Sequence, residues 1–150
     1  MQKKAKKILG VDYGEARTGL AHSDDLGIFA VGMGNIKSYN KEKAAEEVAK
    51  NAEDIGAELI VLGKPVNMDG TCGEKVRAVE YFAELIKAHT EIPIDFFDER
   101  LSTVSAHRFL TDSGIKAKNH RKIVDSLAAE IILQGYMDMQ KIKFNRQKDI

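Results

Sequence analysis

The chain has a single cysteine, no tryptophan, no long apolar run and no excess of charge of either sign. One cysteine excludes an intramolecular disulfide and a zinc site built from cysteines. Without tryptophan, the four tyrosines and six phenylalanines do not favour an extensive surface for stacking nucleic-acid bases. Since no apolar stretch approaches a membrane span and the basic start leads directly into a short strand, we expect a cytoplasmic protein with no membrane partner.

The size and composition are those of one ordinary domain. The chain has 150 residues and is 43% hydrophobic, enough to bury a real core, and no shift of composition marks a second domain. We expect an ordered core at about residues 8–139, with charged tails. The 23 basic and 23 acidic residues balance, but the basic ones gather at the start, at residues 116–122 and near the end. Such a patch can bind phosphates, although charged ends are more often simply solvated.

Hydrophobic periodicity predicts the element order β-β-β-α-β-α-β-α-α. We expect strands at residues 8–13, 17–23, 28–36, 59–62 and 92–97, and helices at residues 41–55, 74–89, 102–111 and from about 124 to 139. The short loops between the first three strands favour an antiparallel meander, and each strand-helix-strand segment favours a parallel crossover. If the first strand pairs with the fourth, the result is an α/β fold with a five-stranded mixed sheet of order 3-2-1-4-5, flanked by helices.

Acidic residues stand where buried elements begin or end. Asp12 closes the first strand, Asp98 and Glu99 follow the fifth, and Asp125 opens the last helix on its apolar side. In the expected sheet, the carboxyl ends of the first, fourth and fifth strands share one edge, where open α/β sheets bind ligands. Carboxylate oxygens suit Mg²⁺ or Mn²⁺, and such ions support phosphodiester hydrolysis. We therefore predict that Asp12, Glu99 and Asp125 are catalytic metal ligands.

Each acidic residue also has a purely structural interpretation. Strand alternation sends Asp98 and Glu99 to opposite faces, so only one should hold metal, and the longer reach of Glu99 favours it. Either residue can instead pair with Arg100 or cap the next helix. Asp12 is also a turn former ahead of the following glycine, and Asp125 is also a favourable charge at a helix N-terminus.

Several basic and polar residues are candidates for holding phosphates. The loop at residues 63–71 joins a buried strand to a helix, although it lacks the P-loop pattern and also suits an ordinary structural turn. The basic run at residues 116–122 leads into the helix that carries Asp125, and by itself it is only a basic loop. The predicted nucleic-acid contacts are Arg17, Lys64, Asn67, Arg100, Lys116, Lys118, His120, Arg121 and Lys122. Arg17 has the alternative role of neutralising Asp12.

Four ordered segments resemble the YqgF/RuvX family of RNase H-like nucleases. They are Val11-Asp-Tyr-Gly-Glu-Ala-Arg-Thr-Gly-Leu-Ala21, Val61-Leu-Gly-Lys-Pro-Val-Asn-Met-Asp-Gly70, Asp98-Glu-Arg-Leu-Ser-Thr103 and Val124-Asp-Ser-Leu-Ala-Ala129. The resemblance implies a five-stranded mixed sheet, metal ligation by Asp12, Glu99 and Asp125, and a role in maturing the 5′ end of bacterial 16S ribosomal RNA. Resolution of Holliday junctions is the other activity proposed for such proteins. Unlike RuvC-like enzymes, this chain has Gly63 and Lys64, and no acid, at the end of the fourth strand.

The sequence leads to one main hypothesis with two rivals. The main one is a Mg²⁺- or Mn²⁺-dependent endonuclease acting on structured RNA, pre-16S rRNA in particular, as a monomer or a homodimer. One rival is a DNA junction resolvase, which requires a dimer that presents two sites to branched DNA. The other is a nucleic-acid-binding assembly factor with a vestigial metal site. An actin-like phosphotransferase, suggested by Asp12-Tyr-Gly14, is disfavoured because the chain lacks room for two sheet domains.

Overall fold

The computed structural model describes residues 5–102 and 126–148. The expected helix at residues 102–111 falls almost entirely outside this part of the chain. Asp125 and all five predicted contacts of the basic run, which are Lys116, Lys118, His120, Arg121 and Lys122, also lie outside the described residues. The predictions for these residues stay predictions.

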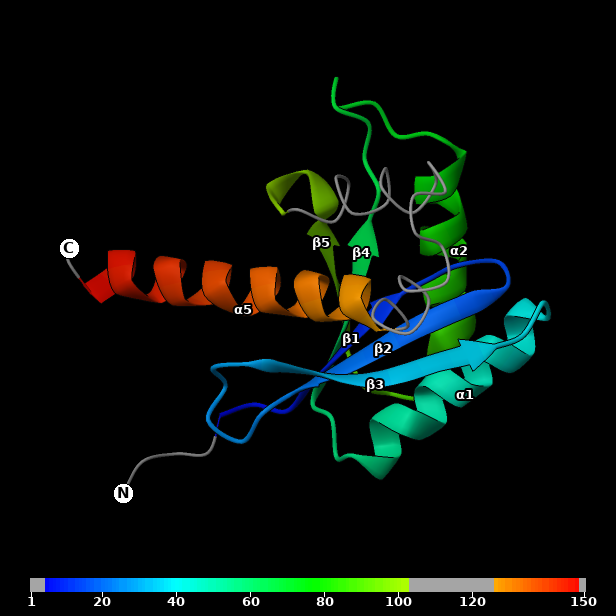
Figure 1. Ribbon diagram of the computed structural model, residues 1–150, viewed down its shortest axis with the longest axis horizontal. Coiled ribbons are helices and arrows are strands. Elements are labelled where there is room, and N and C mark those ends of the chain that lie inside the picture. The colour runs from blue at the N-terminus through cyan, green and yellow to red at the C-terminus, as the bar shows by residue number, and fades with distance from the viewer. Residues whose placement is uncertain (1–4, 103–125, 149–150) are drawn as a thin grey trace, which may run out of the picture.

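A five-stranded mixed sheet forms the centre of the molecule (Figure 1). Its strands are β1 (Ile8–Asp12), β2 (Arg17–Ser23), β3 (Ala30–Lys37), β4 (Leu59–Lys64) and β5 (Ile94–Asp98). The order is β3-β2-β1-β4-β5, with antiparallel pairing of β1, β2 and β3 and parallel pairing of β4 to β1 and to β5. The predicted fold class and strand order are confirmed.

Helices cover both faces of the sheet (Figure 1). The helices α1 (Lys41–Asp54) and α2 (Glu74–Lys87) pack on one face, and α5 (Leu127–Lys148) crosses the other. The 3₁₀ turn η1 (Glu99–Leu101) directly follows β5. Asn40 caps α1 through its side chain, and Gly56, with a φ of +68°, follows the end of that helix. None of the described helices is long and apolar enough to span a membrane.

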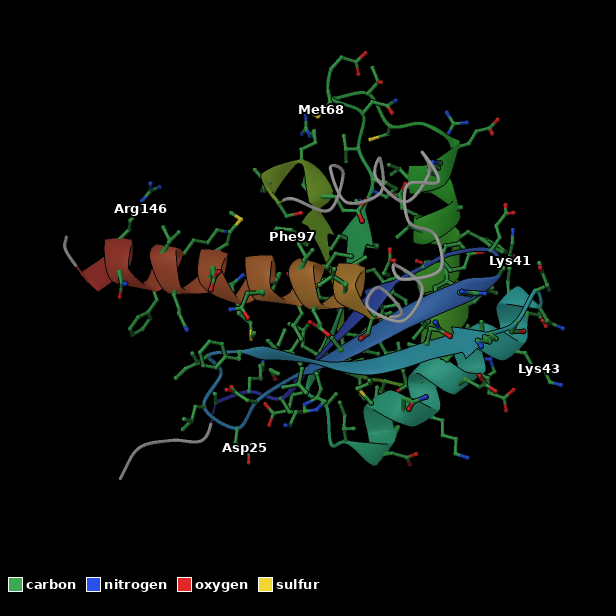
Figure 2. All side chains as sticks on the ribbon, in the orientation of Figure 1. Asp25, Lys41, Lys43, Met68, Phe97 and Arg146 are labelled. Atoms are coloured by element: carbon green, nitrogen blue, oxygen red, sulfur yellow. The ribbon has the colours of Figure 1, made fainter. Side chains whose placement is uncertain are left out.

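Glycines let α5 lie directly against the backbone of the sheet. A Cβ atom on Gly10 would lie 2.7 Å from Cβ of Leu133, and one on Gly135 would lie 2.6 Å from the ring of Phe97. Figure 2 shows Phe97 beside α5, where it joins the core between this helix and the sheet. The helix continues nine residues beyond Met139 to Lys148, so the stretch expected as the start of a charged tail is helical here.

Candidate active site

Asp12 is the last residue of β1 and lies on the α5 face of the sheet. Along β1, Ile8 and Gly10 meet α5, whereas Leu9 and Val11 are buried against α1 and α2. Since side chains alternate along a strand, Asp12 shares the face of Gly10. Its position at the carboxyl end of β1 follows from where the apolar strand ends, as the sequence predicts.

The strand neighbours of Asp12 on this face are both glycines. Asp12 pairs with Gly19 of β2. On the other side, Val11 pairs with Leu62 in parallel register, so Gly63 is the next residue of β4 beside Asp12. Neither glycine has a side chain to fill the face next to the carboxylate. The sequence shows both glycines, but only the pairing reveals that they flank Asp12.

Glu99 lies on the same face as Asp12 and reaches back over β4. It is only 3% exposed and begins η1, two residues after Phe97, which packs against α5. A Cβ atom on Gly63 would lie 3.1 Å from Oε1 of Glu99. Because β1 and β5 are separated by two strand spacings, about 10 Å, this reach brings the Glu99 carboxylate from the end of β5 to a position above β4, nearer to Asp12.

Asp98 has a different role from its neighbour. Its carboxylate accepts hydrogen bonds from the backbone N–H of Arg100 at 2.9 Å and from Nη2 of Arg100 at 2.7 Å, and it caps η1. The hydrogen bond from the Arg100 side chain is the main cause that lowers the pKa of Asp98, and the same pairing raises the pKa of Arg100. The structural interpretation of pairing and capping therefore describes Asp98, and Glu99 is the carboxylate that shares a face with Asp12.

The donor chemistry of these two carboxylates suits a divalent cation that prefers oxygen ligands. Among residues 5–102 and 126–148, no group of three His, Cys, Asp or Glu side chains is close enough to hold a metal ion. The predicted third ligand, Asp125, lies outside the described residues, two positions before α5 begins at Leu127. Two of the three predicted ligands therefore lie in the described part of the chain and share one face of the sheet, and the ligand set stays a prediction.

Arg17 lies on the same face as the two carboxylates. It begins β2 and is exposed. It shares a face of this strand with Ala21, which packs against α5. Directly opposite Arg17 on β3 stands Lys37. None of the ion pairs within the described part of the chain joins Arg17 to Asp12. Two cations placed opposite each other on adjacent strands repel, so this pair suits an anion arriving from outside.

Lys64 points to the other side of the sheet. It shares the α2 face of β4 with Leu62. There its Nζ lies 3.7 Å from Oε2 of Glu80 and 4.2 Å from the centre of the Phe96 ring. The structure therefore does not bring Lys64 together with Asp12 and Glu99. A contact of Lys64 with phosphate would be on the far side of the sheet edge.

Asn67 belongs to the loop between β4 and α2, and the Arg100 side chain lies beside Gly70 of the same loop. Asn67 donates from Nδ2 to Oγ1 of Thr71 at 2.9 Å, and its carbonyl accepts from the backbone N–H of Gly70. A Cβ atom on Gly70 would lie 3.5 Å from Nη1 of Arg100. Figure 2 shows Met68 at the far end of this loop, beyond the carboxyl end of β4. The hydrogen bonds order the turn, and Arg100, paired with Asp98 at the end of β5, lies next to it.

Comparison with known proteins places this arrangement in a family. Residues 6–139 match the family model described as "RuvX: Holliday junction resolvase". A protein of Clostridioides difficile (strain 630) named "Putative pre-16S rRNA nuclease" is 42% identical over 134 residues, which is 89% of this chain and 95% of the relative. A protein of the same name from Desulfitobacterium hafniense is 37% identical over 143 residues, which is 95% of this chain and 99% of the relative.

A solved structure has the same fold. The fowlpox virus resolvase, crystallised with Holliday junction DNA, is 16% identical and superposes with a TM-score of 0.50, covering 89% of this chain and 98% of the resolvase. At this identity the likeness concerns the fold alone. The family match over most of the chain and the high identity to the bacterial relatives show that the chain belongs to the RuvX family.

Proposed function

We propose that this protein is a cytoplasmic, Mg²⁺- or Mn²⁺-dependent endonuclease that cuts phosphodiester bonds in structured RNA, with the 5′ end of pre-16S rRNA as its target. The observation that carries the proposal is the buried Glu99 carboxylate, which extends over Gly63 on the face where Asp12 ends β1. The names of the bacterial relatives support RNA as the substrate.

The residues of this site have separable tasks. Asp12 and Glu99 hold the metal, with Asp125 as the third ligand. A divalent cation bound there supplies charge stabilisation at the phosphoryl group and an activated water. Gly19 and Gly63 place no side chain of their own beside Asp12, and the Glu99 carboxylate extends over Gly63.

Basic residues position the nucleic acid around this centre. Arg17, with Lys37 opposite, binds a flanking phosphate on the α5 face of the sheet. Arg100, oriented by Asp98, stands near the loop that follows β4 and binds a second phosphate. Replacing Arg17 by alanine should weaken RNA binding by a similar factor for all sequences and reduce the dependence of log Kd on log salt concentration by about one.

A DNA junction resolvase is the second candidate, since the description of the matching family names that activity. Such an enzyme cuts two strands of a branched molecule and therefore acts as a homodimer with two sites. The same residues would hold metal in either case. The two candidates differ in substrate and in the number of protomers that bind it.

The test compares pre-16S rRNA fragments with four-way DNA junctions, each incubated with the protein in Mg²⁺ and in Mn²⁺. Wild type should cut the RNA, whereas Asp12→Asn should bind it without cutting. The matched control is Asp54→Asn, which neutralises an exposed carboxylate at the end of α1, on the other face of the sheet. This control should cut like wild type.

Each of the other outcomes rejects a specific part of the proposal. Cleavage of the DNA junction alone rejects the RNA substrate and favours the resolvase. Binding without cleavage by wild type rejects the nuclease and favours an assembly factor. Undiminished cleavage by Asp12→Asn rejects the assignment of the site.

A further inference from the structure

A cavity lies directly behind Asp12, on the opposite face of the sheet edge. It has a volume of about 210 Å³ and lies between the turn after β1, the end of β4 and the first half of α2. Its lining residues are Tyr13, Gly14, Glu15, Gly63, Pro65, Lys75, Ala78 and Val79. One water molecule needs only about 10–15 Å³ of such space, so the cavity is large enough for a ring-sized organic group.

Tyr13 lines this cavity with its side chain but not with its hydroxyl oxygen. The Tyr13 ring packs against Phe82 with ring centres 4.3 Å apart. Within the described part of the chain, its oxygen is the only buried side-chain polar atom without a hydrogen-bond partner. A buried hydroxyl is normally paired, and leaving it unpaired destabilises the fold. This oxygen has almost no accessible surface, so a ligand in the cavity would touch the rest of the Tyr13 side chain and not the hydroxyl.

The cavity walls suit a flat aromatic ring. Pro65, Ala78 and Val79 give it apolar sides, and the Tyr13 ring adds an aromatic surface. Two exposed charged residues of opposite sign, Glu15 and Lys75, complete the lining. Apolar and aromatic surface with a hydrogen-bonding group is the chemistry that binds an unstacked nucleobase.

The cavity also stands in the right place for a nucleotide of the substrate. Tyr13 follows Asp12 directly, so their Cα atoms are about 3.8 Å apart and their side chains lie on opposite faces of the sheet. Gly63 flanks Asp12 on one face and lines the cavity on the other. A strand whose phosphate lies at Asp12 can therefore pass over the sheet edge and place a neighbouring base in the cavity.

We propose that this cavity binds one unpaired nucleobase of the substrate strand, next to the phosphate at Asp12, and that the Tyr13 side chain and the apolar walls pack against that base. The inference rests on the proposed nuclease function and adds a selection rule to it. A base held in a helix must first be extruded, which is unfavourable, so the cavity favours cleavage beside a nucleotide that is already unpaired.

The experiment is an abasic scan of a fluorescently labelled RNA that spans the 5′ end of mature 16S rRNA. Binding is measured without divalent ions, so that no cleavage occurs, while the base is removed from one nucleotide at a time. In wild type, removal of one particular base should weaken binding about tenfold. Cleavage assays in Mg²⁺ with the same RNAs locate the cut relative to that nucleotide.

Two variants and one control connect the effect to the cavity. Ala78→Leu fills the cavity from a half-buried helical position and should bind intact RNA about tenfold more weakly, with no further loss on removal of the critical base. Tyr13→Phe keeps the ring and removes a hydroxyl that the cavity does not reach, so the contribution of that base should stay close to that in wild type. Ala88→Leu makes the same change at the exposed end of α2, away from the cavity, and should behave as wild type.

The outcomes separate this inference from the function on which it rests. The proposal of a base pocket is wrong if wild type cuts RNA but no base removal weakens binding. It is also wrong if Ala78→Leu responds to base removal as wild type does. In both cases the proposed nuclease function is unaffected. If neither RNA nor DNA is bound or cut, both proposals fail. Binding of free nucleoside monophosphates that is lost in Ala78→Leu, with a flat abasic profile, would make the cavity a site for free nucleotides and overturn the inference.

Discussion

The adjacent carboxylates Asp98 and Glu99 provide a sharp test of the site, because the chain sends them to opposite faces of the sheet. Glu99→Gln keeps the shape of the side chain and removes its negative charge from the face of Asp12. Metal ligation stabilises the transition state by several kcal/mol. Losing about 3 kcal/mol of this stabilisation slows cleavage by roughly a hundredfold or more.

The substitution Asp98→Asn, at the neighbouring residue, should leave the cleavage rate almost unchanged. Asp98→Asn breaks a charge pair with Arg100 but leaves an oxygen that can still cap η1. Because partly exposed ion pairs contribute little to stability, the Tm should fall by no more than about 4 °C. The cleavage rate should stay within about threefold of wild type, since Asp98 does not share the face of Asp12.

The assay measures single-turnover cleavage of the pre-16S rRNA fragment by excess enzyme, with RNA affinity and Tm determined on the same preparations. Glu99→Gln should retain its fold and bind RNA within a few-fold of wild type. Loss of cleavage in Asp98→Asn with retention in Glu99→Gln would refute the assignment of faces. An equal loss in both variants would show that the two carboxylates act together.

The same Asp98 variant makes a prediction about pH. The side-chain hydrogen bond from Arg100 lowers the pKa of Asp98 below its ordinary value of 3.8. A carboxyl whose pKa is lower in the folded state stabilises the fold above its unfolded pKa, and this stabilisation is lost as the pH falls through the folded pKa. The Tm difference between wild type and Asp98→Asn should therefore be constant at about pH 6 and close towards about pH 3. A difference that widens on acidification would contradict the pairing.

Two further predictions concern the packing of α5 on the sheet. Gly10→Ala should lower the free energy of unfolding, measured in urea, by about 2 kcal/mol, because the new methyl group would meet Cβ of Leu133 at 2.7 Å. The control Gly73→Ala, where the nearest atom would be 3.5 Å away, should leave that free energy almost unchanged. Tyr136→Phe removes a hydrogen bond of 2.8 Å to Oδ2 of Asp95 and should lower the Tm by about 3 °C at neutral pH. Burial raises the pKa of Tyr136 to about 12, so the stabilisation present below the ordinary value of 10.0 should disappear as the pH rises towards 12, and the Tm difference from wild type should close there.

Most of the fold was predictable because local patterns and topology agree. Short loops favour the antiparallel meander and the two helical crossovers favour parallel strands, so the order of the sheet follows once the first strand is paired with the fourth. The start of β3 was less predictable. Ile28 and Phe29 are apolar and were expected within the strand, but they lie in the turn that Asp24 organises, where the Asp24 side chain accepts from the backbone N–H of Ile28. Phe29 is 64% exposed, and its hydrophobicity alone gave no sign of this.

The site was predictable where a simple period decides the geometry. Alternation along β5 correctly separates Asp98 from Glu99, and the same period, applied to β4, would have sent Lys64 to the α2 face with Leu62. The buried hydroxyl of Tyr13 was not predictable. It depends on how the ring of Tyr13 meets Phe82 of α2 on the same face of the sheet, which no spacing along the chain reveals.

Gly63 explains how the site can be built without an acid at the end of the fourth strand. A Cβ atom there would lie 2.5 Å from Cδ1 of Ile132, which is fully buried, and 3.1 Å from Oε1 of Glu99. Any side chain on residue 63 would therefore compete with both the packing of α5 and the Glu99 carboxylate. The glycine that removes one carboxylate from β4 is the same glycine that lets another, from the end of β5, extend over that strand towards Asp12.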